Sequence, residues 1–185
     1  MKRFGKIDEQ QKATVLWRQS LFVPNTMCLN QLLLKPDVVM HCAAYTSVDL
    51  AESEEDEAYR INVSGTRNIT VAAAKAGAKL CYISTDYVFD GDASIAFREY
   101  DQTNPRNVYG KSKRAGEVIV QTLSSHYFIV RTSWVYGLYG SNFLKTMLKL
   151  AQDRNSLKVV NDQLGSPTYT VDLAIFIEQL IQTER

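Results

Sequence analysis

The feature that most constrains this chain is the alternation, from residue 36 onward, of short apolar runs with longer segments of helical period. The short runs are rich in apolar, often β-branched side chains and predict buried strands: residues 37–42, 79–84, 127–130 and 157–160. The longer segments predict helices: residues 55–76, 108–124, 141–151 and 170–181. Strands that alternate with helices form βαβ units, so the sequence predicts an α/β fold with a Rossmann-like, doubly wound parallel sheet.

Two of these helices have a predicted buried face. In the helix over residues 108–124 the apolar stripe consists of Ala115, Val118, Ile119 and Leu123. In the last helix the side chains expected to point inward are Leu173, Phe176, Ile177 and Leu180. A helix of a globular protein normally packs its apolar stripe against the core, so we expect both sets to be buried.

The first 35 residues do not follow the alternation. Residues 8–22 and 25–34 could each form a helix, and no strand is predicted before residue 36. Gly5 is the only glycine before Gly65. The sheet is therefore expected to be partial and to lack the usual first βαβ unit.

Charge and cysteine content exclude several functional classes. Lysine and arginine number 21 against 20 acidic residues, a net charge of +1, which gives no basic surface for nucleic acid or an anionic membrane. No apolar stretch approaches the roughly 20 residues of a transmembrane helix. The three cysteines are widely spaced and form no CxxC pair, so neither a disulfide framework nor a metal site is predicted, and a reducing cytoplasm fits best.

Ligands of open α/β sheets bind beyond the carboxyl ends of the strands, which directs attention to the residues after each predicted strand. Thr85 and Asp86 follow the second strand, where a hydroxyl could hydrogen-bond a reacting oxygen. The alternative is that Ser84 and Thr85 only cap the following turn. A tryptophan in a core is common, but Trp134 follows the third strand, where it could stack on a base or a sugar.

Tyr109 and Lys113 form a second candidate pair. Residues four positions apart lie on one face of a helix, so the phenol and the ammonium should point the same way. A cation within about 4–6 Å favours the phenolate and lowers the tyrosine pKa, and such a phenol can exchange a proton with an alcohol or ketone oxygen. Taken alone, the same spacing also arises by chance.

Two polar residues lie in otherwise apolar patterns. Asn62 falls on the apolar stripe of the helix over residues 55–76, where a buried amide needs hydrogen-bond partners. It either holds backbone or water near Tyr109 or ties two elements together. His41 lies within a predicted strand with no acid placed to orient it, and a packed core histidine is the favoured interpretation.

Taken together, these motifs resemble the extended short-chain dehydrogenase/reductase family, and most narrowly its dTDP-4-dehydrorhamnose reductases. The resemblance covers about residues 36–181 and rests on six segments in the family's order and spacing. They are His41–Asp49, Ile61–Thr66, Ser84–Gly91, Tyr109–Lys113 with Gly116 and Glu117, Arg131–Gly137, and Asp162–Thr168. Sugar-nucleotide dehydratases of this superfamily place a glutamate where this chain has Tyr87, so the resemblance implies a reductase.

The resemblance implies a reaction and a set of roles. The reaction is the NAD(P)H-dependent reduction of the 4-keto group of dTDP-4-dehydro-L-rhamnose to dTDP-L-rhamnose, a precursor of cell-surface polysaccharide. Tyr109 would donate the proton, Lys113 would lower the tyrosine pKa and bind the nicotinamide ribose, and Thr85 would bind the keto oxygen. The implied cofactor-binding residues are Ala44, Tyr45, Thr46, Ile83, Tyr109 and Lys113. The implied substrate-binding residues are Val48, Thr85, Asp86 and Trp134.

The chain also departs from the family's pattern. Members open with a glycine-rich turn whose backbone amides hold the cofactor pyrophosphate at a helix N-terminus, and no such turn is found in this sequence. Residues 1–35 are therefore expected to be an atypical segment, followed by a truncated NAD(P)-binding domain over residues 36–185. The rival hypothesis is a non-catalytic binding or regulatory module. Some family members dimerise, so a homodimer is also among the expectations.

Overall fold

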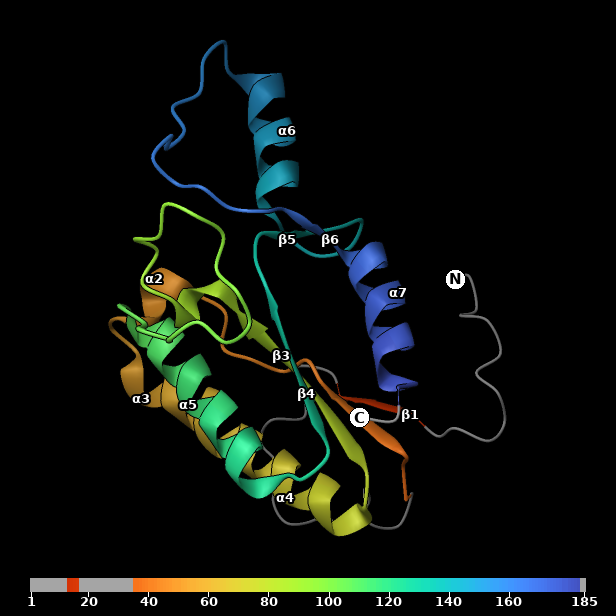
Figure 1. Cartoon of the computed structure of the whole chain (residues 1–185). Helices are drawn as coiled ribbons and strands as arrows, with labels where there is room; N and C mark the ends of the chain where they lie inside the picture. Colours follow the sequence, from red (N-terminus) through yellow and green to blue (C-terminus); the bar gives the residue numbers. More distant parts are fainter. Residues whose placement is uncertain (1–12, 17–34, 184–185) are drawn as a thin grey trace. The chain divides into compact units, whose positions relative to one another are not determined.

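The computed structural model describes residues 13–16 and 35–183 (Figure 1). The described residues divide after Arg131 into two compact units, the first ending at residue 131 and the second covering residues 132–183. Each unit is described by itself.

A sheet of parallel strands forms the centre of the first unit. Its strand order is β1 (Ala13–Leu16), β2 (Val38–His41), β3 (Lys79–Thr85) and β4 (Tyr127–Thr132). β1 pairs with β2, and β2 pairs with β3, both in parallel, so that Ala13, Val38 and Lys79 stand in register. The predicted partial Rossmann-like sheet is thereby confirmed, with three of its strands where the sequence placed them.

β1 corrects the prediction for the N-terminal segment. Residues 13–16 form a strand inside the range predicted as a helix over residues 8–22, so the expectation of no strand before residue 36 was wrong. Four residues carry little periodic signal, and their pairing with β2 outweighs a weak local preference. The remainder of that predicted helix, and the one over residues 25–34, lie outside the described residues.

The helices of the first unit follow the predicted pattern. They are α2 (Val48–Ala51), α3 (Glu55–Tyr59), α4 (Thr66–Ala76) and α5 (Val108–Leu123). A π-helical segment, η2 (Arg60–Gly65), joins α3 to α4, so residues 55–76 form the predicted continuous helix. Gly77 ends it with φ of 71°, in the left-handed region that favours glycine.

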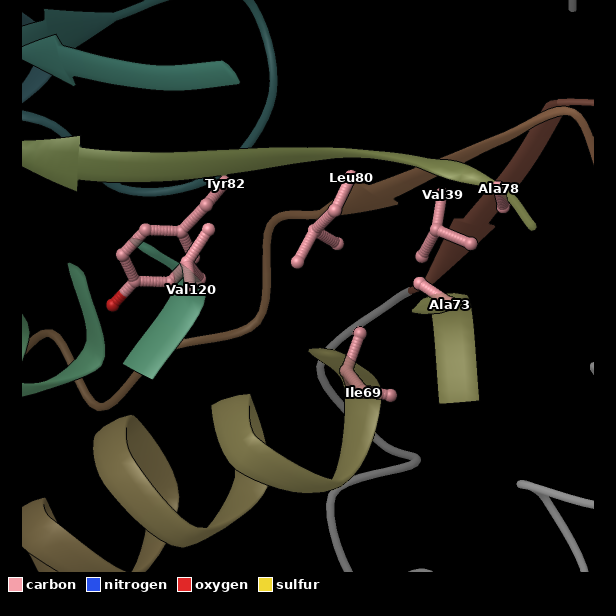
Figure 2. Packing of buried hydrophobic residues seen from close by; sticks show 7 residues of the cluster. All are labelled: Val39, Ile69, Ala73, Ala78, Leu80, Tyr82 and Val120. Carbon is pink, nitrogen blue, oxygen red and sulfur yellow. The ribbon is translucent and has the colours of Figure 1, made fainter. Parts of the chain in front are cut away.

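The main core of the first unit lies between the sheet and two helices (Figure 2). Val39, Leu80 and Tyr82 of the sheet pack against Ile69 and Ala73 of α4. Val120 of α5 and Ala78, which precedes β3, complete the cluster. All seven residues are buried. Because β2, β3, α4 and α5 all contribute to this core, the ends of β2 and β3 and the face of α5 are held in fixed positions.

The buried face of α5 differs from the predicted one. Val118 and Leu123 are exposed, whereas Tyr109, Lys113 and Glu117 are buried. Close approach explains the difference, because a Cβ on Gly116 would lie 2.5 Å from the Tyr82 hydroxyl. The face of α5 that packs against β3 therefore carries glycine and polar side chains. The aliphatic side chains Val118 and Leu123 lie outside this face.

The second unit contains a two-stranded parallel sheet and two helices. The strands are β5 (Val135–Tyr136) and β6 (Thr168–Tyr169), and the helices are α6 (Phe143–Asp153) and α7 (Thr170–Ile181). Both helices were predicted. The strand predicted over residues 157–160 is absent from the described structure, and Val159 and Val160 are exposed there.

The predicted inward face of α7 is only partly correct. Ile177 is buried and Leu173 and Leu180 are half-buried, but Phe176 is exposed. Within this unit, the described residues provide no second layer that would cover Phe176. Across the described ranges, no helix has both the length and the apolar character needed to cross a membrane.

Candidate active site

Tyr109 lies in the first turn of α5, and two side chains fix the start of this helix. The Asn107 side-chain oxygen accepts from the Gly110 N–H at 2.7 Å, and Glu52 Oε1 accepts from the Val108 N–H at 2.8 Å. The first backbone N–H groups of a helix have no partner within the helix, so such caps stabilise its start. They set the position from which the Tyr109 phenol projects.

Lys113 is buried one turn further along α5, with 2% of its surface exposed. Its Nζ donates to the backbone oxygen of Ile83 at 2.7 Å and lies 4.1 Å from the centre of the Tyr82 ring. Burial lowers the pKa of Lys113 to about 7, and the negative charge of Glu117 opposes that shift. Lys113 can therefore both hold and release a proton near neutral pH.

Thr85 ends β3 beside these residues and is also buried. Its Oγ1 accepts from the Tyr87 N–H at 3.2 Å and donates to Asp86 Oδ1 at 3.0 Å. The Thr85 hydroxyl also interacts with the Tyr109 side chain. Both predictions for Thr85 are thus compatible, because it caps the short 3₁₀ turn over residues 86–88 and lies next to Tyr109.

The pKa of Tyr109 is raised, contrary to the expected lowering by Lys113. Burial is the largest cause; the charge of Asp86 and the phenol of Tyr87 add to it, and the Thr85 hydroxyl acts in the opposite direction. With a pKa of about 7, Lys113 is partly neutral at physiological pH and supplies only part of a positive charge. Tyr109 is consequently a protonated phenol at neutral pH, the form that can donate a proton.

Asn62 forms hydrogen bonds that hold the segment after β2 next to α5. The Asn62 side chain accepts from the Tyr45 N–H at 2.8 Å and donates to the Tyr45 backbone oxygen at 3.2 Å and to Ser112 Oγ at 2.9 Å. Asn62 lies in the π-helical segment η2, a conformation often found at functional sites. It ties η2, α5 and the Tyr45 backbone together, one of the two roles expected of it.

Residues 44–46 border the end of β2, next to β3. Ala44 and Tyr45 are half-buried and Thr46 is exposed. Tyr45 and Val48 pack against the small cluster that contains Tyr109. The structure therefore brings five other predicted positions close to the Tyr109–Lys113 face: Tyr45, Val48, Ile83, Thr85 and Asp86.

His41 is a packed core histidine, as predicted. It is fully buried, its Nε2 lies 3.0 Å from Thr66 Oγ1, and its ring centre is 5.3 Å from that of Tyr82. Burial lowers the pKa of His41 to about 3, and the positive charge of Lys113 contributes to this shift. His41 is thus neutral at physiological pH.

Trp134 belongs to the second unit, and its role in substrate binding stays a prediction. It is exposed and has φ of 46°, an uncommon backbone conformation for a side chain of this size. Gly165 lies against its ring, where a Cβ would come within 2.8 Å of an indole carbon. Residues 133–134 and 165–168 are therefore packed together inside the second unit.

Two contributors to the site were assigned no role from the sequence, although both lie in a segment that carried the resemblance. Gly110 allows α5 to approach the turn after β3, because a Cβ there would lie 2.2 Å from the Tyr87 backbone oxygen. Glu117 is a fully buried carboxylate one turn beyond Lys113. Its spacing of four from Lys113 was the available signal, since that spacing places both side chains on one helix face.

Comparisons with known proteins show which family the chain is similar to. Residues 6–185 match the family described as RmlD substrate binding domain, a wider range than the residues 36–181 that carried the resemblance. The chain is 51% identical over 140 residues to the spore coat polysaccharide biosynthesis protein SpsK of Bacillus subtilis, covering 76% of this chain and 50% of that protein. It is 49% identical over 148 residues to a dTDP-4-dehydrorhamnose reductase of Aggregatibacter actinomycetemcomitans, covering 80% of this chain and 50% of that protein.

Solved structures give the same result. The crystal structure of dTDP-4-dehydrorhamnose reductase from Bacillus anthracis in complex with NADP has a TM-score of 0.86 and 49% identity to this chain. The match covers 90% of this chain and 59% of that one. The chain spans about half the length of the curated relatives it matches.

Proposed function

This chain belongs to the RmlD substrate binding domain family, and on that premise we propose that its site reduces the 4-keto group of dTDP-4-dehydro-L-rhamnose to dTDP-L-rhamnose with NADPH or NADH. Relatives about half identical to it carry the name dTDP-4-dehydrorhamnose reductase. The observation that carries the proposal is the grouping of Tyr109, Lys113 and Thr85 at the carboxyl end of β3. Ligands of such sheets bind at this edge.

Each of the three side chains has a role that its surroundings support. Tyr109 is protonated at neutral pH because its pKa is raised, so it can donate the proton that the forming alkoxide requires. Thr85 places a hydroxyl next to the phenol and would hydrogen-bond the keto oxygen. Asp86, half-buried beside Thr85, would accept a hydrogen bond from a sugar hydroxyl. Val48 and Trp134 are the further substrate contacts that we propose.

Among the residues present, Lys113 is the one whose hydrogen-bonding groups best fit a nicotinamide cofactor. Within the described ranges, the Lys113 ammonium makes one hydrogen bond, to Ile83, and it has three N–H groups. The remaining donors are available for the hydroxyl groups of a ribose. Ala44, Tyr45, Thr46 and the backbone at Ile83 would line the rest of that site. The bound cofactor would supply the hydride for the sugar carbon.

The test is the formation of dTDP-L-rhamnose by the purified chain and by its Tyr109→Phe variant. NADPH is supplied at millimolar concentration, because Gly5 is the only glycine before Gly65 and weak binding of the pyrophosphate is expected. The variant loses only the phenolic hydroxyl, so we expect the rate of ketone reduction to fall about 10²–10⁴-fold.

Tyr127→Phe is the matched control, since it removes a half-buried phenol elsewhere in the first unit. We expect the control to reduce the sugar at the parent's rate. Equal rates for the parent and Tyr109→Phe would show that Tyr109 is not the proton donor. Absence of product from the parent, with NADPH binding intact, would instead favour a binding or regulatory module.

A further inference from the structure

A buried carboxylate with four hydrogen-bond donors lies behind the candidate active site. Glu117 Oε1 accepts from Ser84 Oγ at 2.6 Å and from Arg131 Nε at 2.9 Å. Its Oε2 accepts from Arg131 Nη2 at 2.8 Å and from Arg114 Nη1 at 3.1 Å. The Glu117 side chain has no exposed surface, so these donors replace its hydration completely.

Ser84 connects this carboxylate to the residues that face the substrate. Ser84 lies between Ile83, whose backbone oxygen binds Lys113, and Thr85, whose hydroxyl lies next to Tyr109. The bond from Ser84 to Glu117 therefore fixes the end of β3 against α5 at the point where both elements supply site residues. Lys113 and Glu117 are one turn apart on the same face of α5, and their charges interact.

The two arginines extend the network to the long loop after β3. Arg131 Nη1 donates to the backbone oxygen of Glu99 at 3.2 Å, and Arg114 Nε donates to Thr103 Oγ1 at 2.8 Å. The guanidinium of Arg131 also lies 4.9 Å from the centre of the Phe89 ring. Both guanidinium groups thus join Glu117 to a loop that begins directly after Thr85 and Asp86.

Stability alone does not account for such a network. Burying an ion pair costs desolvation energy that its attraction often only balances, and apolar replacements of similar volume are frequently as stable. Glu117 also acts on the charge of Lys113, because it opposes the lowering of the Lys113 pKa by burial. The other titratable groups around Lys113 are His41 and Cys42 at the end of β2, Tyr82 on β3, and Tyr109 on α5.

We propose that Glu117 is a positioning residue for the reduction, which holds the Ile83 carbonyl, the Thr85 hydroxyl and Lys113 in one arrangement through Ser84 and Arg131. This inference rests on the proposed function, which it deepens by adding a residue that does not touch the substrate. Lys113 is the group through which Glu117 acts, and its protonation state reports on the arrangement without any turnover.

The test measures the Lys113 pKa by NMR titration of the lysine side-chain signals, assigned from the spectrum of Lys113→Met. Glu117→Gln keeps the shape of the side chain and removes its charge, so we expect the Lys113 pKa to fall by about one unit or more. Glu117→Asp restores a carboxylate and should recover part of the shift. Glu57→Gln is the control, because it makes the same change of charge at a carboxylate paired with Arg60 at the surface.

A second variant, Ser84→Ala, tests the proposal if Glu117→Gln does not fold. Ser84→Ala removes one hydroxyl and leaves the paired charges in place, so a change of the Lys113 pKa in this variant reports a loss of positioning and not a loss of charge. Thr70→Val matches it, since it removes a buried hydroxyl that donates to the Thr66 backbone oxygen within α4. A Lys113 pKa unchanged from the parent in folded Glu117→Gln or Ser84→Ala would overturn the proposal, whether or not the chain reduces the sugar.

Discussion

In the first unit the apolar side chains of β2, β3, α4 and α5 enclose one another, whereas in the second unit Ile177 is the only buried hydrophobic residue among those described. The two helices of the second unit expose large apolar side chains along much of their length. They include Phe143, Leu144 and Leu148 of α6 and Val171, Ile175 and Phe176 of α7. Apolar periodicity predicted helices in both units, but only a sheet packed against them makes those side chains a core.

The same contrast bears on catalysis. Tyr109, Lys113 and Thr85 lie on elements that the first unit packs firmly, and a site built on rigid elements keeps its geometry better than one on mobile segments. Trp134 lies in the second unit, where few side chains are buried. We therefore expect substitutions in the first unit to cost much more stability than matched substitutions in the second.

The largest expected difference is between two leucines. Leu80 is fully buried in the core of the first unit and Leu148 is mostly exposed on α6. Leu80→Ala removes buried methyl groups and leaves a cavity, so the free energy of unfolding should fall by about 2–5 kcal/mol. Leu148→Ala should change it by less than about 0.5 kcal/mol. Denaturant unfolding measures both, and equal losses would show that α6 is packed as tightly as the core.

A pair of glycines gives the next largest effect. A Cβ on Gly110 would meet the Tyr87 backbone oxygen, whereas a Cβ on Gly137 would meet the side chain of Thr170. Gly110→Ala must move the backbone next to Thr85 and should destabilise the chain by about 1–3 kcal/mol. Gly137→Ala should cost less, because a side chain can yield more easily than backbone. The comparison is made by thermal unfolding, and a larger loss for Gly137→Ala would contradict it.

The last prediction is a dependence of stability on pH that arises from His41, a polar residue of the tightly packed first unit. Its pKa is about 3 in the folded chain and near its ordinary value of 6.5 when unfolded. Between these values the unfolded chain binds more protons, so His41 lowers stability as the pH falls from 6.5 toward 3. The slope from this one group is at most about 1.4 kcal/mol per pH unit.

His41→Gln should make the unfolding free energy less dependent on pH in this window. Urea unfolding of the parent and the variant at several pH values measures the difference. An unchanged pH dependence in the variant would mean that His41 is solvated or protonated in the folded chain.

How far the sequence predicted this structure depended on the range of the interactions involved. The strands β2, β3 and β4, the four long helical segments, and the pairing of Tyr109 with Lys113 follow from local periodicity, and the place of Thr85 follows from a strand end. That Thr85 belongs with Tyr109 and Lys113 was implied by the family resemblance. β1 could not be predicted, because its four residues become a strand through pairing with β2. The strand predicted over residues 157–160 failed because apolar residues alone do not supply a neighbouring strand.

The polar buried face of α5 could not be predicted for a similar reason. Glu117 is buried because Ser84, 33 residues earlier, and Arg131, 14 residues later, bond to it. Apolar periodicity assigned the inward face to Val118 and Leu123 instead, and both are exposed. The raised pKa of Tyr109 likewise depends on burial that is set by the fold as a whole.

The most direct test of the account follows a deuterium label from the nicotinamide of NADPH to the sugar. The purified chain is incubated with dTDP-4-dehydro-L-rhamnose and NADPH that carries deuterium at carbon 4 of the reduced ring, on each face in turn. We expect one of the two labelled cofactors to give dTDP-L-rhamnose with deuterium at carbon 4 of the sugar, with Tyr109→Phe giving little or none. A parent chain that yields no labelled product from either cofactor would contradict the proposed reductase site.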